Sequence, residues 1–379
     1  MKLKLFILIG LITWFSGISQ ELALVKEDNL FGYINKKGDY AIKPQFELAK
    51  NFSEGYAAAT KDGKWGFINS QGEWIIQPQY EKVNYFNSGY VLVSNDGNWS
   101  YINAKGQTLE VPSLDKYYDF EDGVAFYRKG DLIGLFNTNG EIILEPTYDK
   151  IMPFKNGYAK VKKGNFWGII DAKGTIVIPV EYDEIGDYSG KAVWGRKGDV
   201  FGIVDSGSLL PVENADKIWD FKSNSDLTYA RSNKKLGYIN TKGEWVIEPQ
   251  FDKARAFVNG LAPVADGKKW GYINEKGDVI VGFQYKDAEI FSDDGLAPVK
   301  DKDWGFIDTQ GNLVIPTQYD INPGFSGFKV MFGGELETGF IKGLARVKYE
   351  KKWGFVNTKG EILGDKWYEN AEPFKEIPK

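Results

Sequence analysis

The sequence predicts an all-β protein, a tandem array of about ten units that each hold three short antiparallel strands. Three observations support this fold class. A phrase of the form aromatic–Gly–aromatic–Ile–Asn returns at a nearly constant step of 34 residues. Apolar and polar residues alternate in short runs bounded by Gly, Asn, Asp and Pro, as in strands. No unit holds an apolar pattern of helical period and helical length.

The glycine of this phrase sets the alignment of the copies. Nine copies carry it and the third has Ser100 in its place, and the steps are 34 or 35 residues until a last step of 49. Ten copies then occupy residues 20–379, with an insertion of 15 residues at 328–342 and no separate domain. The copies start near residues 21, 55, 89, 123, 157, 190, 226, 260, 295 and 343.

One unit is represented by residues 295–320, "GLAPVKDKDWGFIDTQGNLVIPTQYD". "LAPV" alternates, "WGFID" is aromatic and β-branched, and "NLVI" is a third run that ends at Pro316. Runs of this kind are typical of strands. Each unit is therefore expected to be three strands and a connecting loop.

A turn is predicted after the second strand. The third residue after the aligned glycine is Asn or Asp in all ten copies, and glycine follows three residues later in nine of them, as in Asn69 and Gly72. An Asx side chain can bond the backbone ahead of it, and glycine accepts positive φ. A calcium loop would need several acids, whereas "NKKG" and "NTKG" are basic. We expect a hairpin turn.

The tryptophan slot before the aligned glycine is expected to be a packing position, because Ile133, Phe201 and Leu236 also occupy it. The glycine is expected to allow a close approach or a bulge. These residues define the structural repeat: Trp65, Gly66, Asn69, Gly72, Trp167, Gly168, Trp270, Gly271, Trp304, Gly305, Trp353 and Gly354.

Other columns repeat as well. Aromatic residues recur fourteen and twenty positions after the aligned glycine, as in Tyr80 and Phe86, and are expected to form the core between neighbouring units. An acid follows the first of these aromatics in most copies, as in Glu81. We expect this acid to accept backbone N–H groups in the connecting loop. The alternative is a solvated ladder that attracts cations.

The repeated phrases "KWGFIN…QGEWIIQPQY" resemble the Trp-Gly repeat family, also called WG or KWG repeats, over residues 21–379. The resemblance implies a β-rich repeat array and no shared catalytic residues. Two assemblies are compatible with it. In an open β-solenoid or superhelical ribbon each unit contacts only its neighbours, whereas in a closed β-propeller the units surround an axis. The open array is the main expectation, since the copies begin and end in the same phase and show no exchanged strand.

The N-terminus predicts export. Basic residues at Lys2 and Lys4, the apolar run "LFILIGLITWF" and small residues before Gln20 are typical of a signal peptide at residues 1–19. The expected location is the periplasm, the outer surface or the medium, with no membrane span after cleavage.

Composition limits the chemistry. Removal of Lys2 and Lys4 from the 47 basic residues leaves 45 against 52 acidic residues, a formal charge of −7, which disfavours nucleic acid. The sequence has no His and no Cys, so triads based on His and zinc sites of His and Cys are excluded. No cofactor is expected.

The sequence favours a monomeric, non-catalytic binding or scaffold protein with a protein or glycan ligand. The candidate ligand contacts are Phe328, Met331, Phe332 and Phe340 of the insertion, together with Trp194 and Trp219 in irregular copies. For the insertion, an extra hairpin that covers the edge between the last two units is an equal alternative. A carboxylate-based glycan-active enzyme and a purely structural envelope spacer are the other hypotheses.

Overall fold

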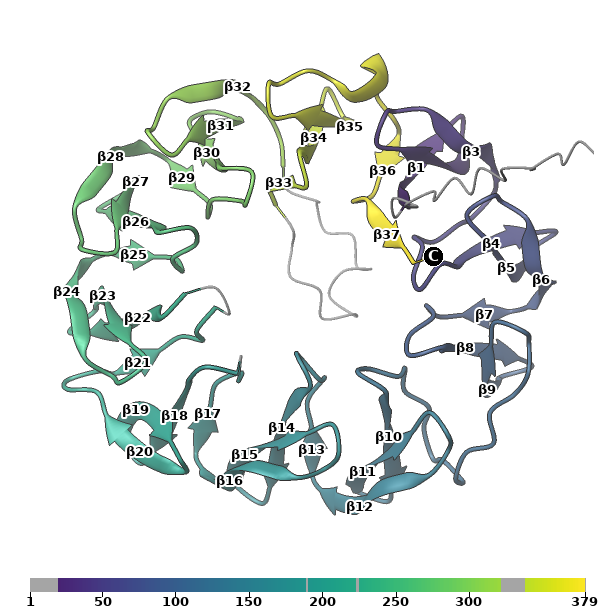
Figure 1. Cartoon of the computed structure of the whole chain (residues 1–379), viewed down its shortest axis with the longest axis horizontal. Helices are drawn as coiled ribbons and strands as arrows, with labels where there is room; N and C mark the ends of the chain where they lie inside the picture. Colours follow the sequence, from purple (N-terminus) through teal and green to yellow (C-terminus); the bar gives the residue numbers. More distant parts are fainter. Residues whose placement is uncertain (1–19, 189, 223–224, 322–337, 379) are drawn as a thin grey trace, which may run out of the picture.

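The computed structural model describes residues 20–188, 190–222, 225–321 and 338–378. In this part of the chain ten small antiparallel sheets stand as blades around a central opening (Figure 1). The expected signal peptide, and Phe328, Met331 and Phe332, lie outside the described residues. The all-β repeat prediction is confirmed, and the arrangement is a ten-bladed β-propeller.

The strands of blades one to five are β1 (Gln20–Glu27), β2 (Leu30–Asn35), β3 (Tyr40–Phe46), β4 (Ala57–Lys61), β5 (Lys64–Ile68), β6 (Trp74–Tyr80), β7 (Lys82–Val83), β8 (Tyr90–Asn95), β9 (Asn98–Asn103), β10 (Val124–Lys129), β11 (Leu132–Asn137), β12 (Ile142–Tyr148), β13 (Lys150–Ile151), β14 (Tyr158–Lys163), β15 (Phe166–Asp171) and β16 (Ile176–Tyr182). Those of blades six to eight are β17 (Glu184–Ile185), β18 (Val193–Lys197), β19 (Val200–Asp205), β20 (Ser208–Pro211), β21 (Lys217–Ile218), β22 (Leu227–Ser232), β23 (Lys235–Asn240), β24 (Trp245–Phe251), β25 (Lys253–Ala254), β26 (Leu261–Asp266), β27 (Lys269–Asn274) and β28 (Val279–Tyr285). Blades nine and ten, with the C-terminal segment, hold β29 (Asp287–Ala288), β30 (Leu296–Lys300), β31 (Trp304–Asp308), β32 (Leu313–Tyr319), β33 (Phe340–Ile341), β34 (Leu344–Tyr349), β35 (Lys352–Asn357), the 3-10 helix η1 (Leu363–Asp365), β36 (Asn370–Ala371) and β37 (Lys375–Ile377).

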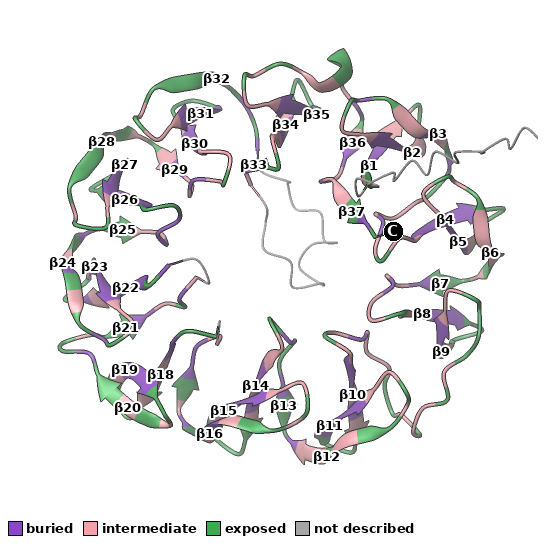
Figure 2. Cartoon of the chain, viewed as in Figure 1, coloured by how far each residue is buried: buried purple, intermediate pink, exposed green. Residues whose placement is uncertain are grey.

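A complete blade has four strands in chain order, such as β13-β14-β15-β16. The first strand is a two-residue segment that follows the last strand of the preceding copy, so each copy contributes to two neighbouring blades. The fourth strand lies at the outer rim (Figure 1). Buried residues concentrate on the middle strands, whereas much of the outer strands is exposed (Figure 2).

The ring is closed by its two ends. β36 and β37 from the C-terminal segment pair antiparallel with β1, for instance Val25 with Ala371 and Gln20 with Ile377. The expectation of an open array is therefore wrong, and the closed alternative is right. The physical reason is that the short segment at the end of the tenth copy pairs with β1, as equivalent segments pair with the next blade at other junctions.

Aromatic residues pack between and within blades as the columns predict. The side chain after the aligned glycine contacts the aromatic residue of the twenty-residue column in the next blade, with Tyr238 and Phe257 at a centroid distance of 4.6 Å. Within a blade, the tryptophan slot lies opposite the fourteen-residue column, as in Trp65 opposite Tyr80. Trp304 is 3% exposed, which confirms a packing role for the slot.

The aligned glycine stands opposite a bulge in the outer strand. In blade two the register jumps between Trp65 and Phe67, so Gly66 faces three residues of the outer strand. A Cβ on Gly66 would lie 2.5 Å from the Ile76 carbonyl oxygen and 2.7 Å from the Pro78 nitrogen. Proline, which lacks an N–H, fits this bulge on an edge strand. The predicted close approach is confirmed.

The hairpin turn is also confirmed. The Asn69 side-chain oxygen accepts the N–H groups of Gln71 and Glu73, and Gly72 has a φ of +83°. The acid column accepts backbone N–H groups, as expected. These N–H groups belong to the turn between the first two long strands of the next blade and not to the connecting loop, so the expected location is wrong. Asp149 accepts from Gly164 at 2.6 Å and Asp252 from Gly267 at 2.7 Å.

Phe340 occupies a core position. Its ring lies 4.9 Å from Phe306 in an edge-on contact, and the side chain is 4% exposed. It takes the place in blade ten that Phe257 takes in blade eight. Phe340 therefore belongs to the repeat and not to the inserted residues, because it supplies the ring that the neighbouring blade requires. In this packing Phe340 presents no open surface to a ligand.

Candidate functional site

The loops between the short first strand and the second strand of the blades point toward the central opening (Figure 1). We call them the inner hairpins. At the tip before β14, Asn156 and Gly157 have φ values of +52° and +80°. Positive φ at two consecutive residues is the geometry of a tight two-residue hairpin turn.

Neighbouring tips are joined by hydrogen bonds, in which a side-chain oxygen of one tip accepts a backbone N–H of the next. The pairs are Glu54 with Ser88 and Gly89, Ser88 with Gly123, Asp122 with Gly157, and Asp294 with Gly343. Many tip residues are thus used to hold adjacent blades in register.

The inner hairpins of blades five and six form a more elaborate contact. Lys155 and Lys160 of blade five both bind the Asp187 carboxylate of blade six, at 2.7 and 2.6 Å. Burial alone would raise the pKa of Asp187, but the hydrogen bonds and positive charges of the two lysines outweigh it and lower that pKa. Asp187 is therefore a fixed anion at neutral pH.

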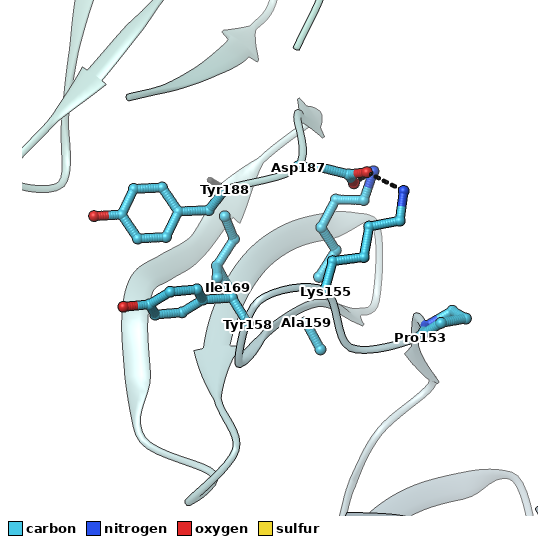
Figure 3. Close-up of a pocket in the computed structure, with 8 residues that line it drawn as sticks. Pro153, Lys155, Tyr158, Ala159, Ile169, Asp187 and Tyr188 are labelled. Atoms are coloured by element: carbon cyan, nitrogen blue, oxygen red, sulfur yellow. Dashed lines mark hydrogen bonds and ion pairs between the residues drawn. The ribbon is translucent and has the colours of Figure 1, made fainter. Parts of the chain in front are cut away.

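Two tyrosines lie beside this ion pair. Tyr158 and Tyr188 meet edge to face with ring centroids 4.7 Å apart, and their hydroxyl groups point the same way, away from Asp187 (Figure 3). Both rings are half-buried and line a small open hollow of about 10 Å³, room for about one water molecule. An aromatic wall beside fixed charges can hold an amphipathic ligand group.

Asp220 fixes one of the two candidate tryptophans. Its carboxylate accepts the Trp194 indole N–H at 2.8 Å and the Asp187 backbone N–H at 2.9 Å. The adjacent Trp219 stacks on Tyr229 at 4.8 Å with an interplanar angle of 25°. Both tryptophans are half-buried. The contacts of Asp187 with the lysines of blade five and with Asp220 of blade seven form one network across three blades.

The sequence identified part of this site. It pointed to Trp194 and Trp219, and it placed Tyr188 in a core column. It did not identify Asp187 and Asp220, which lie within the inner hairpins of blades six and seven. The available signal was their shared repeat position, because each acid directly precedes an aromatic residue, Tyr188 or Phe221.

Within the described residues, no group of three or more His, Cys, Asp or Glu could hold a metal ion. None of the helices in that part of the chain is long and apolar enough to cross a membrane.

Asp187→Asn is expected to lower the free energy of unfolding at pH 7 by about 1 kcal/mol, because two lysines lose their anion. The folded-state pKa of Asp187 is lowered, so its contribution is present above the unfolded-state pKa and is lost as pH falls through the folded-state pKa. Urea titrations at pH 7 and pH 3 should show the difference between variant and parent shrinking at the lower pH. Asp226→Asn is the control, since Asp226 pairs with Lys191 while 77% exposed, and it should change little.

The fold and this inner surface define a β-propeller built from tandem repeats. The family model described as "WG containing repeat" matches nine segments, at 31–65, 65–99, 99–132, 133–165, 167–199, 237–270, 270–303, 304–321 and 353–376. The chain therefore belongs to the family of WG-repeat proteins.

Solved structures with a similar fold are distant in sequence. A crystal structure of a eukaryotic initiation factor is 10% identical, with 94% of this chain and 98% of that chain covered and a TM-score of 0.51. Dihydro-heme d1 dehydrogenase NirN in complex with DHE is 12% identical, with 79% and 73% covered and a TM-score of 0.32. Hsv2p of Kluyveromyces lactis is 10% identical, with 69% and 96% covered and a TM-score of 0.29. The likeness to the initiation factor concerns the fold alone. A comparison with curated proteins finds no match.

Proposed function

We propose that this protein is an exported, non-catalytic binding scaffold of the cell envelope, and that its protein or glycan ligand contacts the inner hairpins of blades five to seven. One observation carries the proposal. In most blades the aromatic residue of the twenty-residue column is a buried Phe. In blade six it is the half-buried Tyr188, which lies beside Tyr158 and lines an open hollow. Repeat proteins place their ligand contacts where copies diverge, because the conserved columns are occupied by packing.

A binding role agrees with the state of the acids at this surface. A carboxylate-based glycosidase needs one acid with a raised pKa to protonate the leaving group. Here the pKa of Asp187 is lowered, and Asp220 is held by the Trp194 N–H. Both carboxylates act as fixed acceptors, Asp187 for two lysines and Asp220 for the Trp194 indole.

Export rests on the basic start, the apolar run and the small residues that precede Gln20. N-terminal sequencing of the protein recovered from the periplasm or medium of a bacterial host tests it. A new N-terminus near Gln20 is expected, and an uncut chain retained in the cytoplasm would contradict export.

Tyr188→Ser is expected to weaken ligand binding at least tenfold, because it removes one wall of the hollow without touching the Asp187 ion pair. Immobilised protein would be screened on a glycan array and against purified envelope proteins of the source cell. The control is Phe166→Ser, an exposed aromatic at the start of β15 that does not line the hollow. Equal binding by parent and Tyr188→Ser would remove this surface from consideration, and no binding in either screen would favour the structural spacer.

A further inference from the structure

A groove lies at the junction of blades six and seven, next to the outer strand β24. It is open to solvent, measures about 370 Å³, and has the half-buried indole of Trp245 in its lining. Glu213 and Asn214 border it from the loop between β20 and β21, Asn233 from the turn before β23, and Glu248 from β24. It is separate from the inner-hairpin surface.

The groove exists because one copy departs from the repeat. In most blades an aromatic residue precedes the acid that binds the next turn, as Tyr182 precedes Asp183. Blade six has Ala215 before Asp216. Asp183 donates its backbone N–H to the Arg196 carbonyl, and Asp216 donates its own to the Arg231 carbonyl. These two hydrogen bonds are equivalent, so Ala215 stands where the preceding copy has Tyr182.

The first two blades show what the missing ring would do. Trp74 is the repeat equivalent of Trp245, since both stand eight residues after the aligned glycine. The Trp74 ring is contacted edge-on by Phe46 of the preceding blade at a centroid distance of 5.9 Å. Ala215 carries no ring. Among the described residues, no aromatic side chain stacks on Trp245. The Trp245 indole N–H donates instead to the Glu213 carbonyl at 3.0 Å, which fixes the ring.

The polar side chains around Trp245 are available to a ligand. Within the described residues, the side chains of Glu213, Asn214, Asn233 and Glu248 take part in no hydrogen bond or ion pair. Lys235, which also lines the groove, is paired with Asp252 at 2.7 Å. The free groups are thus two carboxylates that accept and two amides that donate and accept, with a net negative charge.

We infer that this groove binds a neutral sugar, with one face of a pyranose ring on the Trp245 indole and its hydroxyl groups bonded by the surrounding carboxylates and amides. An indole offers a flat apolar surface with a polar edge, and the apolar face of a pyranose matches it. Hydroxyl groups satisfy both the carboxylates and the amides, whereas an anionic glycan would meet two unpaired carboxylates. This inference gives the proposed binding function a ligand class and a second location.

The test is isothermal titration of the full chain with neutral oligosaccharides, namely cellohexaose, maltohexaose, mannohexaose and xylohexaose. At least one is expected to bind, and Trp245→Ala is expected to weaken it tenfold or more. Trp74→Ala is the matched control and should leave binding unchanged, because Phe46 already covers that ring. Ala215→Phe should restore the aromatic of the repeat, fill the groove and abolish binding without lowering the melting temperature.

Three outcomes would overturn the inference. The first is that none of the four sugars binds. The second is that sugar binding survives both Trp245→Ala and Ala215→Phe. The third is that these variants lose the binding of a peptide but keep the binding of every sugar. Tyr188→Ser separates the two sites. If sugar binding is lost with Tyr188→Ser and kept with Trp245→Ala, the inner surface is the sugar site and the groove is not.

Discussion

Removal of residues 370–379 is expected to open the ring and lower the free energy of unfolding by roughly 5 kcal/mol, from the strand hydrogen bonds and the apolar area lost. This segment supplies β36 and β37, the strands that pair with β1. It also buries Ala371 and Ile377, at 0% and 6% exposure, and the Ala371 carbonyl accepts a hydrogen bond from Arg346 at 2.8 Å. Blade one would lose its strand pairing with the C-terminal segment and keep only the side-chain packing of Ala23, Val25 and Ile34 on blade ten.

Thermal unfolding and small-angle scattering measure the two consequences. The truncated chain should melt at a lower temperature and have a larger radius of gyration than the parent. Removal of residues 378–379 alone is the control, because Pro378 is exposed and follows β37. A truncated chain with the parent's compactness and stability would show that the end-to-end pairing is dispensable for closure.

Gly305→Ala is expected to lower the free energy of unfolding by about 2–3 kcal/mol, the cost of forcing an atom into a packed core. A Cβ there would lie 2.5 Å from the Ile315 carbonyl oxygen and 2.8 Å from the Pro316 carbonyl carbon. Both are backbone atoms of β32, so neither can rotate away. The bulge opposite Gly305 would have to move, and with it the outer edge of blade nine.

Gly282→Ala is the matched control from the neighbouring blade. Gly282 is exposed, and a Cβ would meet no atom within 4 Å. Its change in unfolding free energy should stay within about 0.5 kcal/mol. Equal effects of the two substitutions in urea titrations would mean that the aligned glycine is not required by close packing.

Much of a single blade follows from the sequence, because the repeated columns report local requirements. Asn69 and Gly72 specify a turn that needs only neighbouring residues. The tryptophan slot and the fourteen-residue column specify a pair on adjacent strands, as in Trp65 and Tyr80. Ten copies of the same signal separate these requirements from chance, which one copy could not do.

The candidate site was harder to predict, since its contacts cross blade boundaries. Asp220 joins Trp194 to the Asp187 backbone across blades six and seven. The two acids share a repeat position before Tyr188 and Phe221, but that spacing does not reveal the contact with Trp194. The groove beside Trp245 arises from the small side chain at Ala215. The equivalent residue of the first copy, Phe46, covers Trp74, and only this contact shows what Ala215 leaves open.

The sequence by itself determined the repeat unit, its strands and turns, the buried aromatic columns and the role of the aligned glycine. These depend on interactions within one copy or between consecutive copies, which the 34-residue step places in fixed register. Closure was decided by the tertiary structure. Each junction adds a rotation, and only the sum of these rotations around the ring brings β36 and β37 to the edge of β1. That sum is a property of the whole chain, so no single copy encodes it.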